Sequence, residues 1–158
     1  MNNYYSNGKL LISGEYLILE GAQALAVPVK YGQGLKVEES SSAKIIWQTN
    51  VNGEFWFNAE FDNYFNINKS SDKDLAIYLS NLLKAARRLN ANFVVDFGYN
   101  LLSEINFNIN WGLGSSSSLI SNIAWWAMLI HFSFLCLFQT GRVTILHVPD
   151  QKNLFCID

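Results

Sequence analysis

The sequence predicts a single α+β domain in which an N-terminal antiparallel sheet precedes the helices. Apolar and polar residues alternate through much of residues 9–59, a pattern typical of half-buried strands. Residues 72–89 instead have apolar residues at helical spacing. Because 50% of the 158 residues are hydrophobic and only 15% are charged, the chain can form a core.

Five strands are expected in the N-terminal sheet, because glycines separate short runs of alternating residues. These runs are residues 9–19, 24–29, 35–39, 45–48 and 54–59. The glycines expected to turn the chain are Gly8, Gly14, Gly21, Gly32 and Gly34. Residues 93–97 and 105–109 are two further strand candidates, since they are rich in aromatic and β-branched side chains.

Residues 72–89 are expected to form a helix. Its apolar face is made by Leu75, Leu79, Leu82, Leu83 and Ala86. Two aspartates lie near its start and basic residues close its end, an arrangement that the helix dipole favours. A second helix is expected from Leu119 onward, after a segment rich in glycine and serine.

The charge balance and the cysteine count exclude several classes of function. With 11 basic and 13 acidic residues the net charge is −2, so no positive field for nucleic acid is expected. Two cysteines twenty positions apart form neither a disulfide framework nor a zinc-ligand pattern. The first residues lack a basic segment followed by an apolar core, so a cytoplasmic location is expected.

An uncharged stretch extends from residue 105 to residue 141, and residues 119–138 are mostly apolar. Because about 20 apolar residues can cross a bilayer, one alternative is a non-catalytic protein anchored in a membrane by a single span over 119–138. The polar start of this segment and His131 favour a buried helix that continues into an unrelated tail. A membrane partner is therefore not expected.

Residues 112–118 have the sequence Gly-Leu-Gly-Ser-Ser-Ser-Ser. Two glycines let the backbone approach a ligand, and serines at a helix start offer N–H and hydroxyl groups to a phosphate. A serine-rich helix cap without a ligand makes the same local hydrogen bonds, so the pattern alone leaves both interpretations open. The segment lacks the lysine of a Walker A loop and the third glycine of a dinucleotide fingerprint.

Two segments together resemble the GHMP small-molecule kinases. Residues 8–29 (GKLLISGEYLILEGAQALAVPV) resemble the first motif of that family, particularly of its mevalonate and phosphomevalonate kinase branch. Residues 110–118 (NWGLGSSSS) resemble the second motif, an ATP phosphate loop, and the order and separation also match. The resemblance implies the fold of the GHMP kinase N-terminal domain, which is ribosomal protein S5 domain 2-like, in truncated form. One departure is Asn108, where the family often has proline.

The resemblance also implies a role for each matching residue. Those that would bind ATP are Gly112, Leu113, Gly114, Ser115, Ser116 and Ser117. The Ser116 hydroxyl would also hold Mg2+, and Ser117 would cap the following helix. Lys9 would be catalytic, beside the acceptor hydroxyl and the γ-phosphate, although composition alone would make it a solvated lysine at a strand end. Glu15 would organise the acceptor side, although a glutamate in a tight turn is as often structural.

The implied activity is transfer of the ATP γ-phosphate to a hydroxyl or phosphate of a small acceptor such as mevalonate or phosphomevalonate. Tyr16 replaces a histidine common in mevalonate kinases, so the acceptor stays open. The Ser-Gly-x-Asp segment of the family, whose aspartate handles the hydroxyl proton, is not readable here, and neither is the C-terminal domain. We therefore expect negligible turnover from this chain, and aggregation through apolar surface that the second half would cover.

Residues 1–127 are expected to form the ATP-binding domain and residues 128–158 an atypical tail. Both cysteines and both histidines of the chain lie in this tail. When the codons of residues 141–149 are read one base out of register, they permit Ser-Gly-Tyr-Asp, the missing motif. We therefore expect a single-base frameshift near Ala127. A natural divergent tail is the alternative, and the nucleotide sequence decides between the two.

Overall fold

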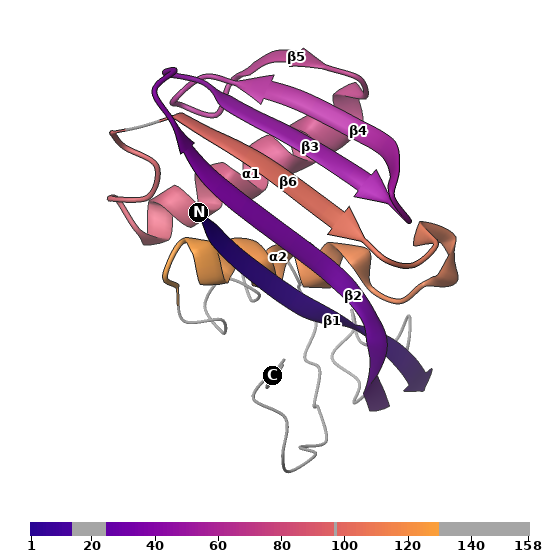
Figure 1. The fold of residues 1–158 in the computed structure, drawn as a ribbon. Helices are drawn as coiled ribbons and strands as arrows, with labels where there is room; N and C mark the ends of the chain where they lie inside the picture. Colours follow the sequence, from indigo (N-terminus) through magenta and orange to yellow (C-terminus); the bar gives the residue numbers. More distant parts are fainter. Residues whose placement is uncertain (14–24, 97, 130–158) are drawn as a thin grey trace.

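Six strands form one sheet, and two helices cover one of its faces (Figure 1). The computed structural model describes residues 1–13, 25–96 and 98–129. The elements are, in chain order, β1 (Asn2–Ser13), β2 (Leu25–Ser40), β3 (Ile45–Val51), β4 (Glu54–Phe61), β5 (Ile67–Ser70), α1 (Lys73–Leu89), β6 (Gly98–Ile105), the 3-10 helix η2 (Ile109–Trp111) and α2 (Ser115–Trp126). The expected α+β class is confirmed.

The strand order is β1-β2-β6-β3-β4-β5, so β1 and β5 lie at opposite edges of the sheet. All neighbours pair antiparallel except β3 and β6, which run parallel. Antiparallel pairing was expected for the N-terminal strands, and β1 with β2 and β3 with β4 pair in this way; β6, which is later in the sequence, lies between β2 and β3. A parallel pair needs a long crossover, and here the chain passes through β4, β5 and α1 before β6 returns beside β3.

The strands predicted over 24–29 and 35–39 are one continuous strand, β2. Gly32 and Gly34 lie inside it and do not turn the chain. A Cβ atom on Gly32 would lie 2.4 Å from the Ser6 carbonyl oxygen and 2.6 Å from the Tyr5 hydroxyl oxygen. A glycine within a strand often marks such a close approach, so here it lets β1 pack closely against β2.

The two later strand predictions are also wrong. In residues 93–96 the chain turns, and Val94 has a φ of 58°. The carbonyl groups of Phe93 and Val94 accept hydrogen bonds from the Arg87 guanidinium, so they are not paired with a neighbouring strand. No strand forms over 105–109. Strand β6 ends at Ile105, the first residue of the predicted strand, and η2 begins at Ile109.

The helix predicted over 72–89 is confirmed as α1. The Asp72 side chain caps it by accepting hydrogen bonds from the backbone N–H groups of Asp74 and Leu75. The second helix, α2, begins at Ser115, earlier than expected. Its N-cap is Gly114 in the left-handed conformation, so the prediction that Ser117 caps this helix is wrong.

The core lies between the sheet and the two helices. Its largest fully buried side chains include Trp47 and Phe61 from the sheet, Leu82 from α1 and Ile123 from α2. Across residues 1–13, 25–96 and 98–129, no helix combines the length and apolar character that a membrane crossing requires. The remainder of the segment that the alternative placed in a membrane, residues 130–138, lies outside the described residues, as does the rest of the tail.

Candidate functional site

Lys9 of β1 lies against the glycine-serine loop at the start of α2. The Lys9 backbone N–H donates a hydrogen bond to the Leu113 carbonyl oxygen over 2.9 Å. A Cβ atom added to Gly114 would lie 3.3 Å from Cγ and 3.5 Å from Cε of Lys9, so the lysine side chain runs beside this glycine. The two segments that carry the sequence resemblance therefore meet in one place.

The loop between β6 and α2 has a conformation that requires its two glycines. Gly112 has φ 68° and ψ 20°, and Gly114 has φ 75° and ψ 45°, a left-handed region that other L-residues rarely adopt. Asn108 caps η2, because its side-chain oxygen accepts a hydrogen bond from the Asn110 N–H over 2.9 Å. Asn108 therefore stabilises the approach to the loop at the position where the resemblance would favour proline.

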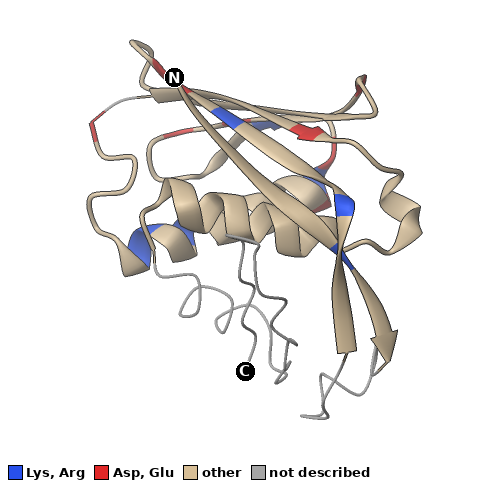
Figure 2. Cartoon of the chain, turned by 60° about the horizontal axis from the view of Figure 1, so that its bottom comes forward, with Lys and Arg blue, Asp and Glu red and all other residues tan. Residues whose placement is uncertain are grey.

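The start of α2 offers backbone N–H groups that have no acceptor within the helix. The Ser118 N–H makes the first intrahelical bond, to the Gly114 carbonyl oxygen over 3.0 Å, so the preceding serine N–H groups have no acceptor within the helix. No acidic residue lies in the first turn, and no side chain of the described residues caps the helix. Helix α2 has no charged residue along its length, and its ribbon is tan throughout in Figure 2. This helix start is suited to an anion, because free N–H groups and the positive end of the helix dipole coincide.

The Lys9 ammonium group lies near this helix start without a carboxylate among the described residues to pair with. Burial lowers the pKa of Lys9 below its ordinary value of 10.5, since a low-dielectric environment disfavours the charged form. Within the described part of the chain, an ion pair joins Lys44, just before β3, to Glu60 of β4. A bound anion would reverse the effect of burial by stabilising the charged lysine.

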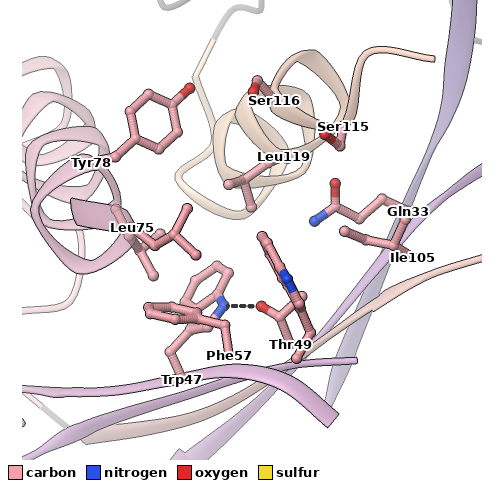
Figure 3. Close-up of a pocket in the computed structure, with 12 residues that line it drawn as sticks. Gln33, Trp47, Thr49, Phe57, Leu75, Tyr78, Ile105, Ser115, Ser116 and Leu119 are labelled. Carbon is pink, nitrogen blue, oxygen red and sulfur yellow. Dashed lines mark hydrogen bonds between the residues drawn. The ribbon is translucent and has the colours of Figure 1, made fainter. Parts of the chain in front are cut away.

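A pocket of about 110 Å³ lies beside the loop, between the sheet and the two helices (Figure 3). Trp47, Thr49, Trp56 and Tyr78 contribute to its wall, together with Ser115 and Ser116 of α2. The Trp47 indole N–H donates a hydrogen bond to the Thr49 hydroxyl oxygen over 2.9 Å, which fixes this ring. The pocket therefore joins an aromatic interior to the two serines at the helix start.

Tyr78 of α1 points toward Ser116 (Figure 3). Burial raises the pKa of the Tyr78 phenol, and the neighbouring Ser116 side chain opposes that rise. The phenol is therefore neutral at neutral pH, and it faces the hydroxyl that the sequence predicts as a metal ligand across the pocket. No sequence pattern identified Tyr78, because its position within the helical repeat of α1 says nothing about α2.

Most residues predicted for the site lie together in the structure. Gly112, Gly114, Ser115 and Ser116 follow one another around the loop and into α2, with Lys9 alongside. Two more residues from the prediction have restricted roles: Leu113 buries its side chain in the core and offers only its backbone, and Ser117 lies within the first turn. Glu15 and Tyr16 lie outside the described residues. In the described ranges no group of three or more His, Cys, Asp or Glu side chains is placed to hold a metal ion.

The fold of this chain is similar to that of several solved structures. The structure is similar to the Methanococcus jannaschii mevalonate kinase, with a TM-score of 0.61 and 21% identity over 80% of this chain and 39% of that chain. A second mevalonate kinase structure gives the same TM-score and identity over 81% and 40% of the two chains. The Lactococcus lactis galactokinase complexed with galactose has a TM-score of 0.54 and 21% identity, over 74% of this chain and 29% of that chain.

The fold is that of the GHMP kinase N-terminal domain. This chain spans about 40% of the length of the two mevalonate kinases. No family model matches the sequence, and no curated protein matches it. The structural likeness therefore establishes the fold alone.

Proposed function

We propose that this chain is the nucleotide-binding part of an ATP-dependent small-molecule kinase. The family reaction would transfer the γ-phosphate of ATP to a hydroxyl or phosphate of a small acceptor, such as mevalonate or phosphomevalonate. A cytoplasmic location, where ATP and Mg2+ are available, belongs to the same proposal. The observation that carries it is the packing of Lys9 against Gly114 at the start of α2.

The loop supplies what the phosphates of a nucleotide require. Positive φ angles at Gly112 and Gly114 expose the backbone, and the N–H groups of Ser115 and Ser116 are left without intrahelical acceptors. The Lys9 ammonium adds a full positive charge beside the loop. Together these groups favour a multiply charged anion over a neutral ligand.

The Ser116 hydroxyl is the side-chain oxygen that would hold Mg2+, a cation that prefers oxygen ligands and shares them with bound phosphates. Bound Mg2+ would neutralise negative charge on the transferred phosphoryl group. Tyr78 lines the same pocket as Ser116 and would help to orient its hydroxyl. The aromatic pocket beside Ser115 offers an apolar, stacking environment that suits the base of the nucleotide.

Within this proposal Lys9 stabilises negative charge where the phosphoryl group meets the acceptor, and Glu15 organises the acceptor side. The sequence has no Ser-Gly-x-Asp segment to supply a carboxylate that accepts the hydroxyl proton. Proton transfer and positioning act together in catalysis. This chain is therefore expected to bind Mg-ATP but to turn it over negligibly.

Binding of Mg-ATP by the purified full chain tests the proposal. Isothermal titration calorimetry is expected to show saturable binding with one site, weakened about tenfold or more in Lys9→Met and Ser116→Ala, because each variant removes a charged or coordinating contact. Lys69→Met is the matched control, since Lys69 is an exposed lysine on β5, at the opposite edge of the sheet.

The control is expected to bind as the wild-type chain does. Equal losses in Lys9→Met and Lys69→Met would show that the binding is unspecific attraction to positive charge. Absence of saturable binding by the folded wild-type chain would overturn the proposal.

A further inference from the structure

We propose that a buried polar cluster behind the loop is a positioning device that holds the phosphate-binding backbone in place. The cluster consists of Ser6, Gln33, Ser103, Ser118 and Asn122, all 2% exposed or less. It joins three strands to Ser118 and Asn122 of α2. The inference rests on the proposed function, in that the loop it positions is the one proposed to bind the nucleotide phosphates.

The sheet side of the cluster is centred on Gln33 of β2, a strand that lies between β1 and β6. The Gln33 side-chain amide donates a hydrogen bond to the Ser103 hydroxyl oxygen of β6 over 2.7 Å. A buried amide is strongly constrained once its donor and its acceptor are both engaged. Gln33 is therefore held by its neighbouring strand and can serve as a fixed reference for the helix above it.

Asn122 connects α2 to two of these strands. Its amide N–H2 group donates to the Gln33 carbonyl oxygen over 2.8 Å, and its side-chain oxygen accepts from the Ser6 hydroxyl over 2.7 Å. Asn122 is fully buried, so neither of its bonds can be exchanged readily for water. These two bonds set the rotation of α2 about its axis and its shift along the sheet.

Ser118 carries the connection into the loop. Its hydroxyl oxygen lies 3.0 Å from the Gln33 side-chain oxygen, 3.0 Å from the Ser115 carbonyl oxygen and 3.3 Å from the Gly114 carbonyl oxygen. One hydroxyl hydrogen is thus shared among an acceptor of the sheet and two acceptors at the start of α2. A shift of Gln33 or α2 would change this sharing and move the backbone that presents the free N–H groups.

A polar cluster can do what an apolar contact at this place would not. Apolar packing is non-directional and tolerates sliding of a helix on a sheet, whereas hydrogen bonds fix distance and direction. The buried side of α2 includes Ser118, Ser121 and Asn122 besides its apolar residues, so apolar packing alone does not determine its register. Ser6 lies on the same strand as Lys9, and the cluster therefore also relates α2 to the lysine.

The test removes one bond of the cluster at a residue that touches neither the loop nor the pocket. In Ser6→Ala the Asn122 side-chain oxygen loses its donor, and Ser6→Cys keeps the volume with a weaker donor. The matched control is Ser80→Ala, because Ser80 is also a buried serine whose hydroxyl donates one hydrogen bond, to the Phe65 carbonyl oxygen of a distant loop. Each full-length variant is measured for melting temperature, for Mg-ATP affinity and for amide hydrogen exchange of residues 112–117.

Both alanine variants are expected to melt at a lower temperature than the wild-type chain. Only Ser6→Ala is expected to weaken Mg-ATP binding, by about tenfold, and to accelerate exchange in residues 112–117, with Ser6→Cys intermediate. If Ser6→Ala fails to fold, Ser6→Cys carries the same comparison. Unchanged affinity and unchanged loop exchange in the folded cluster variants would overturn the inference.

The exchange measurement separates the two proposals, because it needs no nucleotide. If the wild-type chain binds no Mg-ATP but Ser6→Ala still loosens residues 112–117, the proposed function fails and the positioning role of the cluster stands. If the wild-type chain binds Mg-ATP and Ser6→Ala affects only the melting temperature, the proposed function stands and the cluster is merely structural.

Discussion

Lys9 and Arg87 are both partly buried cations, but their surroundings differ. The Arg87 guanidinium donates hydrogen bonds to the carbonyl oxygens of Asn63, Phe93 and Val94, and it lies 4.2 Å from the Phe65 ring centre. The Lys9 ammonium has no carboxylate partner among the described residues, and burial lowers its pKa. Arg87 therefore has hydrogen-bond acceptors within the fold. The burial of the charged Lys9 lowers the stability of the folded state, and no carboxylate among the described residues compensates for it.

This difference separates a structural cation from a candidate functional one. A buried charge is tolerated when several acceptors surround it, and it is costly otherwise. Arg87 joins α1 to two loops at the end of the domain remote from the glycine-serine loop, and so it stabilises the fold. Lys9 destabilises the folded state through its burial but lies where an anion would reverse that effect, as proposed for a nucleotide.

The largest effect is expected from Arg87→Met. The substitution leaves carbonyl groups without their donor and removes the contact with the Phe65 ring, and we expect a loss of about 3 kcal/mol in the free energy of unfolding. Urea denaturation measures it. Mg-ATP affinity of the fraction that remains folded is expected to be unchanged.

Arg88→Met is the control for this prediction. Arg88 is exposed in the same turn of α1, and its replacement is expected to change the free energy of unfolding by less than about 0.5 kcal/mol. If both arginine variants lose the same stability, general charge at the helix end and not the carbonyl contacts of Arg87 would be responsible.

A smaller effect is expected from Gly114→Ala. The left-handed conformation costs an alanine about 1–2 kcal/mol, and its Cβ would lie 3.3 Å from Cγ of Lys9. The variant is therefore expected to lose stability and also to bind Mg-ATP about tenfold more weakly, since the lysine side chain must shift. Urea denaturation and calorimetric titration report the two effects separately.

Gly53→Ala offers a matched comparison, because Gly53 also has a positive φ, 83°, but no atom lies within 4 Å of an added Cβ. Its cost in stability is expected to be similar, with no change in Mg-ATP binding. Weaker binding in Gly53→Ala would mean that backbone strain alone, acting through global stability, explains the result at Gly114.

Elements of the fold that depend on contacts within one segment are predictable from the sequence, whereas those that depend on contacts between distant segments are not. Helix α1 is predictable, because the Asp72 cap and the apolar spacing both lie within one segment. The residues at 93–97 have side chains that favour a strand. However, the Phe93 and Val94 carbonyl oxygens accept hydrogen bonds from Arg87, and the positive φ of Val94 turns the chain. Gly32 of β2 was expected in a turn, because the feature that requires a glycine there, the close approach of β1, comes from another strand and is not visible in the local sequence.

For the candidate site, the sequence predicts the loop and Lys9 through their resemblance to known motifs, and the structure brings them into contact. Their binding roles stay a prediction. The cluster behind the loop has no comparable signal, because Ser6 and Asn122 are 116 residues apart and belong to different elements. Tyr78 was missed for the same reason, since its contact with Ser116 joins two helices. Such contacts depend on tertiary packing rather than on a local pattern.

The smallest predicted effect concerns the pH dependence of stability. The folded-state pKa of Lys9 lies below the ordinary value of 10.5 because of burial, so at lower pH the folded protein carries the full cost of a buried charge. As the pH rises through the folded-state pKa toward 10.5, the folded state loses its proton before the unfolded state does, and stability increases. Lys9→Met lacks this increase. The advantage in free energy of unfolding that Lys9→Met gains by removing the buried charge is therefore expected to shrink as the pH approaches 10.5.

Urea denaturation of both proteins over this pH range measures the difference. The wild-type chain must be compared with Lys9→Met, because the stability of both proteins also changes with pH for another reason. Burial raises the pKa values of Tyr4, Tyr78 and Tyr99, so their ionisation in the unfolded state lowers stability as the pH rises. These tyrosines are common to both proteins, so their contribution cancels to the extent that they do not interact with Lys9. A constant difference in free energy of unfolding across this pH range would mean that burial does not lower the pKa of Lys9. The contrast with Arg87 would then have no electrostatic basis.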